Sequence, residues 1–208
     1  MSSTKRKTIV YIDGFNLFHA LKEMHWKKYY WLDLACFSLK ILSPMQTLVV
    51  VKYFTSRSIN DPQGQKRQNT YIEALETLAD RVVIQYGKFT SDDWGCSVCG
   101  KLMKVHHEKQ TDVNISVSLL TDAQEDRFDD AILITADSDQ MGTVKYVTDT
   151  YPTKRVIVAF PPGRSSTDLV PVASNVCHLG QKEFRESQFP NEVMSKTGYP
   201  LIRPHSWV

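Results

Sequence analysis

The sequence has few cysteines, little net charge and no long hydrophobic run, and each of these shortages excludes a class of protein. Its 208 residues include 4 cysteines and carry a formal net charge of +2. So few cysteines indicate a reducing cytosol rather than a disulfide-rich secreted domain, and near neutrality means that any basic surface must be local. The longest apolar run, around residues 47–51, is much shorter than the ~20 residues of a membrane helix. We therefore expect a cytoplasmic protein without a membrane partner.

The rest of the composition is typical of one globular domain. The content of 42% hydrophobic and 23% charged residues is that of a soluble protein, and the length suffices for a full core. Residues 1–7 are basic, but Asp13 interrupts the following apolar run too early for a secretory signal. We expect a flexible basic segment over residues 1–7, one domain over 8–180, and an irregular tail, packed through Trp207, over 181–208.

Short apolar runs alternate with helix-like segments along most of the chain. The runs are rich in β-branched residues without polar alternation, which is typical of buried parallel strands. We expect strands at residues 8–12, 47–54, 82–86, 131–135, 155–160 and 175–179. Helices are expected at residues 16–24, 33–42, 65–80, 111–124 and 139–150, with a short one before residue 175. This alternation predicts a three-layer α/β/α domain with a mainly parallel sheet, interrupted by a hairpin-like insertion over residues 89–108.

Four aspartates follow two of these strands or open a helix. Asp13 ends the first strand, Asp137 and Asp139 follow the strand at 131–135, and Asp112 lies in the first turn of the helix at 111–124. Each acid taken alone has a simpler explanation as a helix cap or as a favourable charge beside a helix dipole. Two acids close together after one strand exceed what a cap needs, however, and Asp112 begins the inward face of its helix.

The carboxyl ends of parallel strands form the ligand crevice of an open α/β sheet, so these acids are expected to converge there. Such a cluster is costly unless a hard cation neutralises it, and carboxylate oxygens suit Mg²⁺ or Mn²⁺. Asn16, in the turn after Asp13, offers a further oxygen. The sequence therefore predicts a metal site made of Asp13, Asn16, Asp112, Asp137 and Asp139.

The segments around these acids resemble the three acidic motifs of NYN domains, which belong to the PIN-like nuclease superfamily. The segments are YIDGFN (11–16), EKQTDV (108–113) and TADSD (135–139). The later loop PPGRSS (161–166) is similar to one typical of the LabA-like subgroup, and the likeness extends from residue 8 to residue 179. One departure is Gln140, because an aromatic residue commonly follows the second aspartate in this family.

The resemblance implies a PIN-like fold with strand order 3-2-1-4-5 and metal-dependent hydrolysis of single-stranded RNA. Asp13, Asp112, Asp137 and Asp139 are then the catalytic acids, and the products carry 5′-phosphate and 3′-hydroxyl ends. One or two divalent ions can activate water and clamp the attacking and leaving oxygens, so no side-chain nucleophile is required. A non-catalytic regulator that binds RNA or protein, and a nuclease acting on DNA, are the alternatives. A homo-oligomer or a protein partner is also left open.

The insertion carries Cys96, Cys99, His106 and His107, which suit a structural zinc ion. The two histidines are adjacent and would point to opposite faces of a strand, so the fourth ligand could be the other histidine, a water or Cys177-His178. The alternative is a reduced cysteine pair on a flexible loop. Any zinc here would be separate from the acidic centre.

Cations and aromatic rings that could bind a single strand lie in two places. Lys104, Lys109, Arg164 and Ser165 are expected to contact phosphates near the acids. The segment KKYYW at 27–31 offers rings on which bases could stack, although these residues could equally be surface cations and core aromatics.

Overall fold

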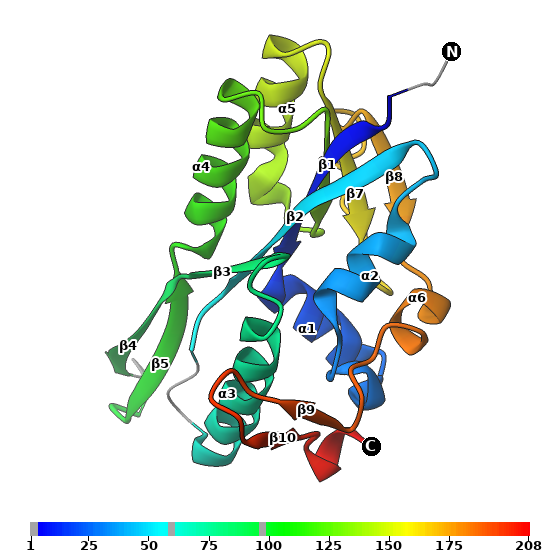
Figure 1. Ribbon diagram of the computed structural model, residues 1–208. Coiled ribbons are helices and arrows are strands. Elements are labelled where there is room, and N and C mark those ends of the chain that lie inside the picture. Colours follow the sequence, from blue (N-terminus) through cyan, green and yellow to red (C-terminus); the bar gives the residue numbers. More distant parts are fainter. Residues whose placement is uncertain (1–3, 58–60, 96–98) are drawn as a thin grey trace.

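The computed structural model describes residues 4–57, 61–95 and 99–208, and only the backbone of residues 89–93 and 102–109 (Figure 1). Its centre is a six-stranded sheet in the order β3-β2-β1-β6-β7-β8. Every neighbouring pair in this sheet is parallel. The strands are β1 (Arg6–Asp13), β2 (Gln46–Thr55), β3 (Val82–Tyr86), β6 (Asp130–Ile134), β7 (Arg155–Phe160) and β8 (Asn175–His178). Among the described residues, every helix is too short or too polar to cross a membrane.

The predicted strand order needs one addition. If the hairpin strands are left out of the count, the order is 3-2-1-4-5 followed by a sixth strand, β8, beside β7. The family pattern has five strands, and the run at 175–179 adds its own pairing, from Ile157 opposite Asn175 to Phe160 opposite His178. The three-layer α/β/α prediction is confirmed.

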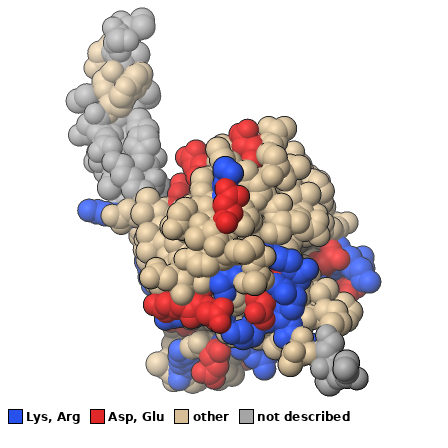
Figure 2. Space-filling view, turned by 90° about the horizontal axis from the view of Figure 1, so that it is seen from above, with Lys and Arg blue, Asp and Glu red and all other residues tan. Residues whose placement is uncertain are grey.

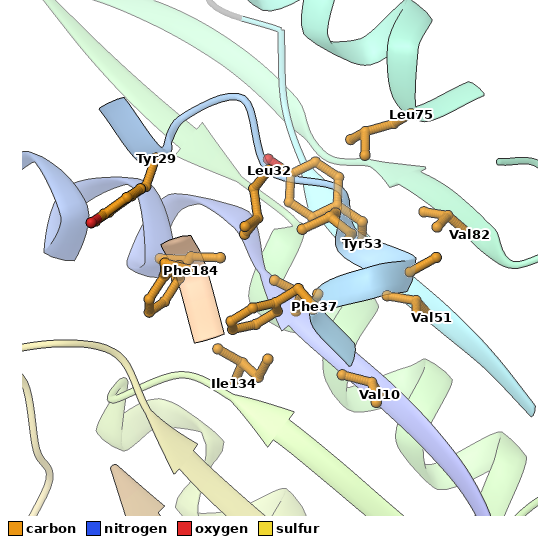
Figure 3. Packing of buried hydrophobic residues seen from close by; sticks show 14 of the residues in the cluster. Val10, Tyr29, Leu32, Phe37, Val51, Tyr53, Leu75, Val82, Ile134 and Phe184 are labelled. Atoms are coloured by element: carbon orange, nitrogen blue, oxygen red, sulfur yellow. The ribbon is translucent and has the colours of Figure 1, made fainter. Parts of the chain in front are cut away.

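Helices cover both faces of the sheet (Figure 1). One layer holds α1 (Gly14–Glu23), α2 (Leu34–Ile41), α3 (Pro62–Glu76) and α6 (Gln181–Arg185), and the other holds α4 (Thr111–Gln124) and α5 (Met141–Thr150). Successive side chains of a strand point to opposite faces, so Val10 and Ile12 join the first core, whereas Ile9 and Tyr11 join the second. Figure 3 shows part of the first core, in which Phe37 and Phe184 stack at 4.8 Å between ring centroids.

Three of the predicted helices differ from the structure for local reasons. The helix expected at 65–80 begins at Pro62, because the Asp61 carboxylate accepts a hydrogen bond from Gln63 N (3.0 Å) and proline is tolerated in a first turn. The helix expected at 16–24 begins at Gly14, because Asp13 caps it. The short helix expected before residue 175 is a set of turns, in which Leu169 O accepts hydrogen bonds from the backbone N–H groups of Val172 and Ala173.

The C-terminal segment is ordered rather than irregular, which corrects the prediction for residues 181–208. It contains α6, the two-stranded ribbon β9 (Glu192–Met194) and β10 (Pro200–Ile202), and the short helix η3 (His205–Trp207). Phe184, Phe189 and Leu201 are buried in the first core. Trp207 packs against the rings of Tyr30, Trp31 and Tyr71, as expected.

The predicted hairpin insertion is confirmed. Strands β4 (Lys88–Gly95) and β5 (Leu102–Lys109) pair antiparallel, with Lys88 opposite Lys109. The hairpin extends from the end of the sheet beside β3 and leads into α4 (Figure 1). Gln110 makes the turn between β5 and α4 in the left-handed region, at φ 79°, which places the first turn of α4 at the carboxyl edge of the sheet.

The amino-terminal ends of the sheet strands, opposite the carboxyl ends, are held together by ion pairs and hydrogen bonds. The fully buried Asp130 at the start of β6 accepts hydrogen bonds from Arg6 Nε (2.6 Å), Arg155 Nε (2.8 Å) and Gln46 Nε2 (2.6 Å). Figure 2 views this end of the molecule, where positive and negative side chains lie next to one another. These bonds tie β1, β2, β6 and β7 together and thereby fix where their carboxyl ends lie.

Candidate metal centre

Three of the four predicted acids meet at the carboxyl edge of the sheet. Asp13 ends β1, Asp137 follows β6, and Asp112 lies in the first turn of α4. One carboxylate oxygen from each lies within 4.8 Å of the other two. The convergence predicted from the sequence is therefore present for this triad.

Hydrogen bonds fix the two strand-end acids. Asp13 Oδ1 accepts from Asn16 N (3.0 Å), and Asp13 Oδ2 accepts from the hydroxyl of the buried Thr135 (2.9 Å). The same hydroxyl oxygen accepts from Asp137 N (3.1 Å), and Asp137 Oδ1 accepts from Asp139 N (3.0 Å). Asp13 and Asp137 are thus helix caps as well as members of the triad, so the capping explanation and the metal explanation hold together.

Two amide side chains position the elements that carry the triad. Asn16 Oδ1 accepts a hydrogen bond from Ala136 N (3.2 Å) and so links the start of α1 to the loop after β6. The buried Gln140 donates from Nε2 to Asp112 O (3.2 Å) and accepts from the Ser116 hydroxyl (3.2 Å). Gln140 thereby holds the loop after β6 against α4 with hydrogen bonds instead of an aromatic contact.

Burial and mutual repulsion disfavour ionisation of the triad. Burial is the main reason that the pKa of Asp13 rises to about 6; the hydrogen bonds from Asn16 and Thr135 oppose this rise, and the charges of Asp112 and Asp137 add to it. The pKa of Asp112 is also raised, first by burial and then by the charges of Asp137 and Asp139. Among the described side chains, none of the four acids has a cationic partner within 4.0 Å. A bound cation would offset this cost.

Asp139 lies outside the triad. Its side chain is exposed, and it is not part of the group whose oxygens lie within 4.8 Å of one another. Its negative charge nevertheless contributes to the raised pKa of Asp112, so it affects the electrostatics of the site. Thr135 and Gln140 were not assigned to the site from the sequence, although Thr135 is the first residue of the TADSD motif and Gln140 follows it directly.

Of the four residues predicted to contact phosphates, the structure describes the side chains of Arg164 and Ser165. Arg164 Nε and Nη2 bind the two carboxylate oxygens of Glu23, at 3.2 and 2.5 Å, near the end of α1. Ser165 is exposed in the same loop. The side chains of Lys104 and Lys109 lie outside the described residues. In the segment at 27–31, Tyr29 and Trp31 are buried at 4% and 0% exposure and are core residues, so they cannot stack on bases.

Of the four zinc ligands predicted in the insertion, Cys99 is the one whose side chain is among the described residues. Cys96 lies outside the described residues, whereas Cys99 is exposed with a free thiol. His106 and His107 are consecutive in β5, opposite Ser91 and Thr90, and their side chains are not described. The remote pair Cys177-His178 belongs to β8, at the other edge of the sheet from β3, so it is the wrong place for a fourth ligand.

If Cys96, Cys99 and one of the two histidines bind zinc, purified protein should contain about one zinc ion per chain, because thiolate and imidazole ligands select this metal. Cys99→Ser should lose the ion, whereas Cys177→Ser, a change of another exposed thiol, should retain it. Elemental analysis measures both. Chelation should increase hydrogen exchange only over residues 89–108; a protein without zinc whose thiols at 96 and 99 react freely would contradict the prediction.

Comparisons with known proteins agree with this architecture. One similar protein is 6-hydroxy-3-succinoylpyridine 3-monooxygenase HspA of Pseudomonas putida (strain DSM 28022 / S16), which is 24% identical over 246 aligned residues that cover 100% of this chain and 77% of that protein. A crystal structure of a Vibrio parahaemolyticus RIMD 2210633 protein of unknown function has the same fold, with a TM-score of 0.55, 20% identity, and coverage of 91% of this chain and 99% of that one.

The motifs and the fold match a family as well as individual proteins. The model of the NYN domain matches residues 7–180, a range that contains all four acids, the hairpin and, apart from Arg6, the six sheet strands. The LabA-like subgroup stays a prediction. The chain belongs to the NYN domain family, a family of PIN-like nuclease domains.

Proposed function

We propose that this protein is a metal-dependent ribonuclease that hydrolyses phosphodiester bonds of single-stranded RNA. The observation that carries the proposal is the triad of Asp13, Asp112 and Asp137, whose oxygens lie within 4.8 Å of one another at the carboxyl edge of a parallel sheet. This edge is where open α/β folds bind their ligands. The family supports nuclease activity in general; RNA as substrate and dependence on metal are the proposal.

The donor set supports Mg²⁺ or Mn²⁺ as the cofactor. Three carboxylates supply hard oxygen ligands, and both ions prefer such ligands while keeping several waters. Burial and the neighbouring carboxylates raise the pKa values of Asp13 and Asp112. A bound cation would offset the cost of ionising them. When bound, the ion supplies positive charge for the phosphate and lowers the pKa of a coordinated water.

The residues of the chain have separate tasks in this proposal. Asp13, held by Asn16 N and Thr135, is the rigid ligand, and Asp112 and Asp137 complete the set from α4 and the loop after β6. The exposed Asp139 lies outside this set and adds negative charge that acts on Asp112. Asn16, Thr135 and Gln140 are positioning residues, because each acts through an element that carries an acid.

The monooxygenase name of the Pseudomonas relative describes that protein's reaction on a pyridine. Oxygenases with non-haem iron typically use two histidines and one carboxylate, whereas the triad here is made of carboxylates alone. The donor set therefore favours phosphodiester hydrolysis for this chain.

The test is cleavage of an end-labelled single-stranded RNA with Mn²⁺ or Mg²⁺, compared with EDTA and with a DNA of the same sequence. We expect metal-dependent cleavage of the RNA that leaves 5′-phosphate and 3′-hydroxyl ends, and slower cleavage of the DNA. Equal cleavage of both strands would assign a general nuclease. Tight metal and RNA binding without cleavage would instead support a non-catalytic regulator.

A further inference from the structure

A cavity of about 530 Å³ opens beside the β1–α1 turn. Residues from α1, α3, η3 and the short helix η1 (Lys27–Tyr29) line it. Its volume falls in the ~300–1,000 Å³ range of pockets that hold small molecules. No residue of the acidic triad lines this cavity, and none of the roles assigned above uses it.

Among the aromatic residues that line the cavity, Phe18, Tyr30 and Trp207 form a continuous run of ring contacts. The ring of Phe18 lies 5.1 Å from that of Tyr30, and the ring of Tyr30 lies 5.7 Å from that of Trp207, between centroids. Phe18 is 42% exposed, and Tyr30 and Trp207 are partly exposed. An exposed aromatic face is what a nucleobase stacks on in proteins that bind single strands. This wall exists only because the C-terminal segment brings Trp207 to Tyr30.

The charge around the cavity favours an anion. Lys22, Lys27 and Arg67 line it, together with one acid, Asp61. The Asp61 carboxylate is already engaged, because it accepts hydrogen bonds from Gln63 N (3.0 Å) and Arg67 Nη2 (3.4 Å). Within the described part of the chain, Lys22 and Lys27 form no ion pair within 4.0 Å. The ligand that fits is aromatic and negatively charged.

The cavity is continuous with the motif that holds Asp13. Gly14 and Phe15 follow Asp13 and line the cavity. A Cβ on Gly14 would lie 2.6 Å from Phe54 O, so glycine allows the turn to pack tightly against β2. Phe18 lies five residues beyond Asp13, which is about 7.5 Å along the helix axis at 1.5 Å per residue. One nucleotide can span such a distance.

We infer that this cavity binds the base of a nucleotide next to the scissile phosphate, with the base stacked on Phe18. This inference rests on the proposed function and adds a subsite to it. The stacking is tolerant of sequence because every base has an aromatic face, while Lys22 and Lys27, which line the cavity, contact the phosphates.

The test is direct binding of adenosine 5′-monophosphate by titration calorimetry in EDTA, with ribose 5-phosphate as the ligand that lacks a base. EDTA removes the metal, so binding reports the cavity rather than the acidic triad. Adenosine 5′-monophosphate should bind about tenfold more tightly than ribose 5-phosphate, within the range expected for one base–aromatic stack. Phe18→Ala should remove this difference, and Phe18→Tyr should restore it. Tyr146→Ala, which removes a ring that is 55% exposed on α5, is the matched control and should bind like the wild type.

Equal affinity for the two ligands, or unchanged affinity in Phe18→Ala, would overturn the inference. Binding of pyridine-3-carboxylate without binding of the nucleotide would overturn it too, in favour of a small aromatic acid. Cleavage assays separate this outcome from the proposed function. RNA cleavage with the same KM in Phe18→Ala and wild type would leave the nuclease proposal standing and reject the subsite. Nucleotide binding without any cleavage would support the subsite and reject the nuclease proposal.

Discussion

Asp137→Asn should reduce metal-dependent RNA cleavage by about 10²-fold or more while leaving the fold intact. The change removes one of three carboxylates whose oxygens lie within 4.8 Å of one another, and ion-based stabilisation of a phosphoryl transition state is worth several kcal/mol. Asn keeps a side-chain oxygen that can accept the hydrogen bond from Asp139 N, so the cap survives. Single-turnover cleavage rates and titration with Mn²⁺ measure the effect.

The same substitution should raise the stability of the metal-free protein. Asp137 adds repulsion to Asp13, whose burial already opposes ionisation, and relief of such repulsion commonly yields ~0.5–2 kcal/mol. Asp149→Asn is the control, because Asp149 is exposed on α5 and pairs with the exposed Lys145 one turn away; its activity and melting temperature should match those of the wild type. If Asp137→Asn retains full metal-dependent cleavage, the cleaving site lies elsewhere.

Local sequence signals predicted where several elements begin and end. The ends of β3, α4 and β7 agree with the predicted residues, because apolar runs and polar breaks are sharp there. Asp13, Asp112 and Asp137 could be brought together from the sequence because carboxyl ends of parallel strands share one edge. Thr135 and Gln140 could not, since their roles depend on which backbone and side-chain atoms face them after folding.

Features that depend on distant segments were missed for the same reason. The segment at 181–208 has weak periodicity, and its order comes from burial of Phe184, Phe189 and Leu201 against helices far away in the chain. The aromatic segment at 27–31 reads equally well as a stacking surface or as core, and packing decided for the core at Tyr29 and Trp31. Of that segment's three rings, Tyr30 is the one that contacts both Phe18 and Trp207 in the wall of the cavity.

Asp130→Ala should lower the free energy of unfolding by about 1–3 kcal/mol, the cost of leaving a buried polar group without its hydrogen-bond partner. Asp130 is fully buried and binds Arg6, Arg155 and Gln46. Gln46 loses its acceptor in a buried position, whereas Arg6 and Arg155, at 34% and 49% side-chain exposure, can turn to water. Urea denaturation measures the loss, and Asp149→Asn, an exposed charge change, should stay within ~0.5 kcal/mol of the wild type.

The pH dependence of stability identifies the cause of this loss. Burial alone would raise the pKa of Asp130, but the hydrogen bonds from Arg155, Gln46 and Arg6 outweigh burial and lower it below its ordinary value of 3.8. The unfolded chain therefore takes up a proton at higher pH than the folded one, and the contribution of Asp130 is present above pH 3.8 and lost as pH falls through the lower folded value. The difference in unfolding free energy between wild type and Asp130→Asn should be constant near neutral pH and shrink below about pH 4. A difference that stays constant down to pH 2 would show that packing, rather than the charge pairs, makes Asp130 important. Thr135 and Asp137 follow the other end of β6, away from Asp130. Folded Asp130→Asn should therefore still cleave RNA below its melting temperature.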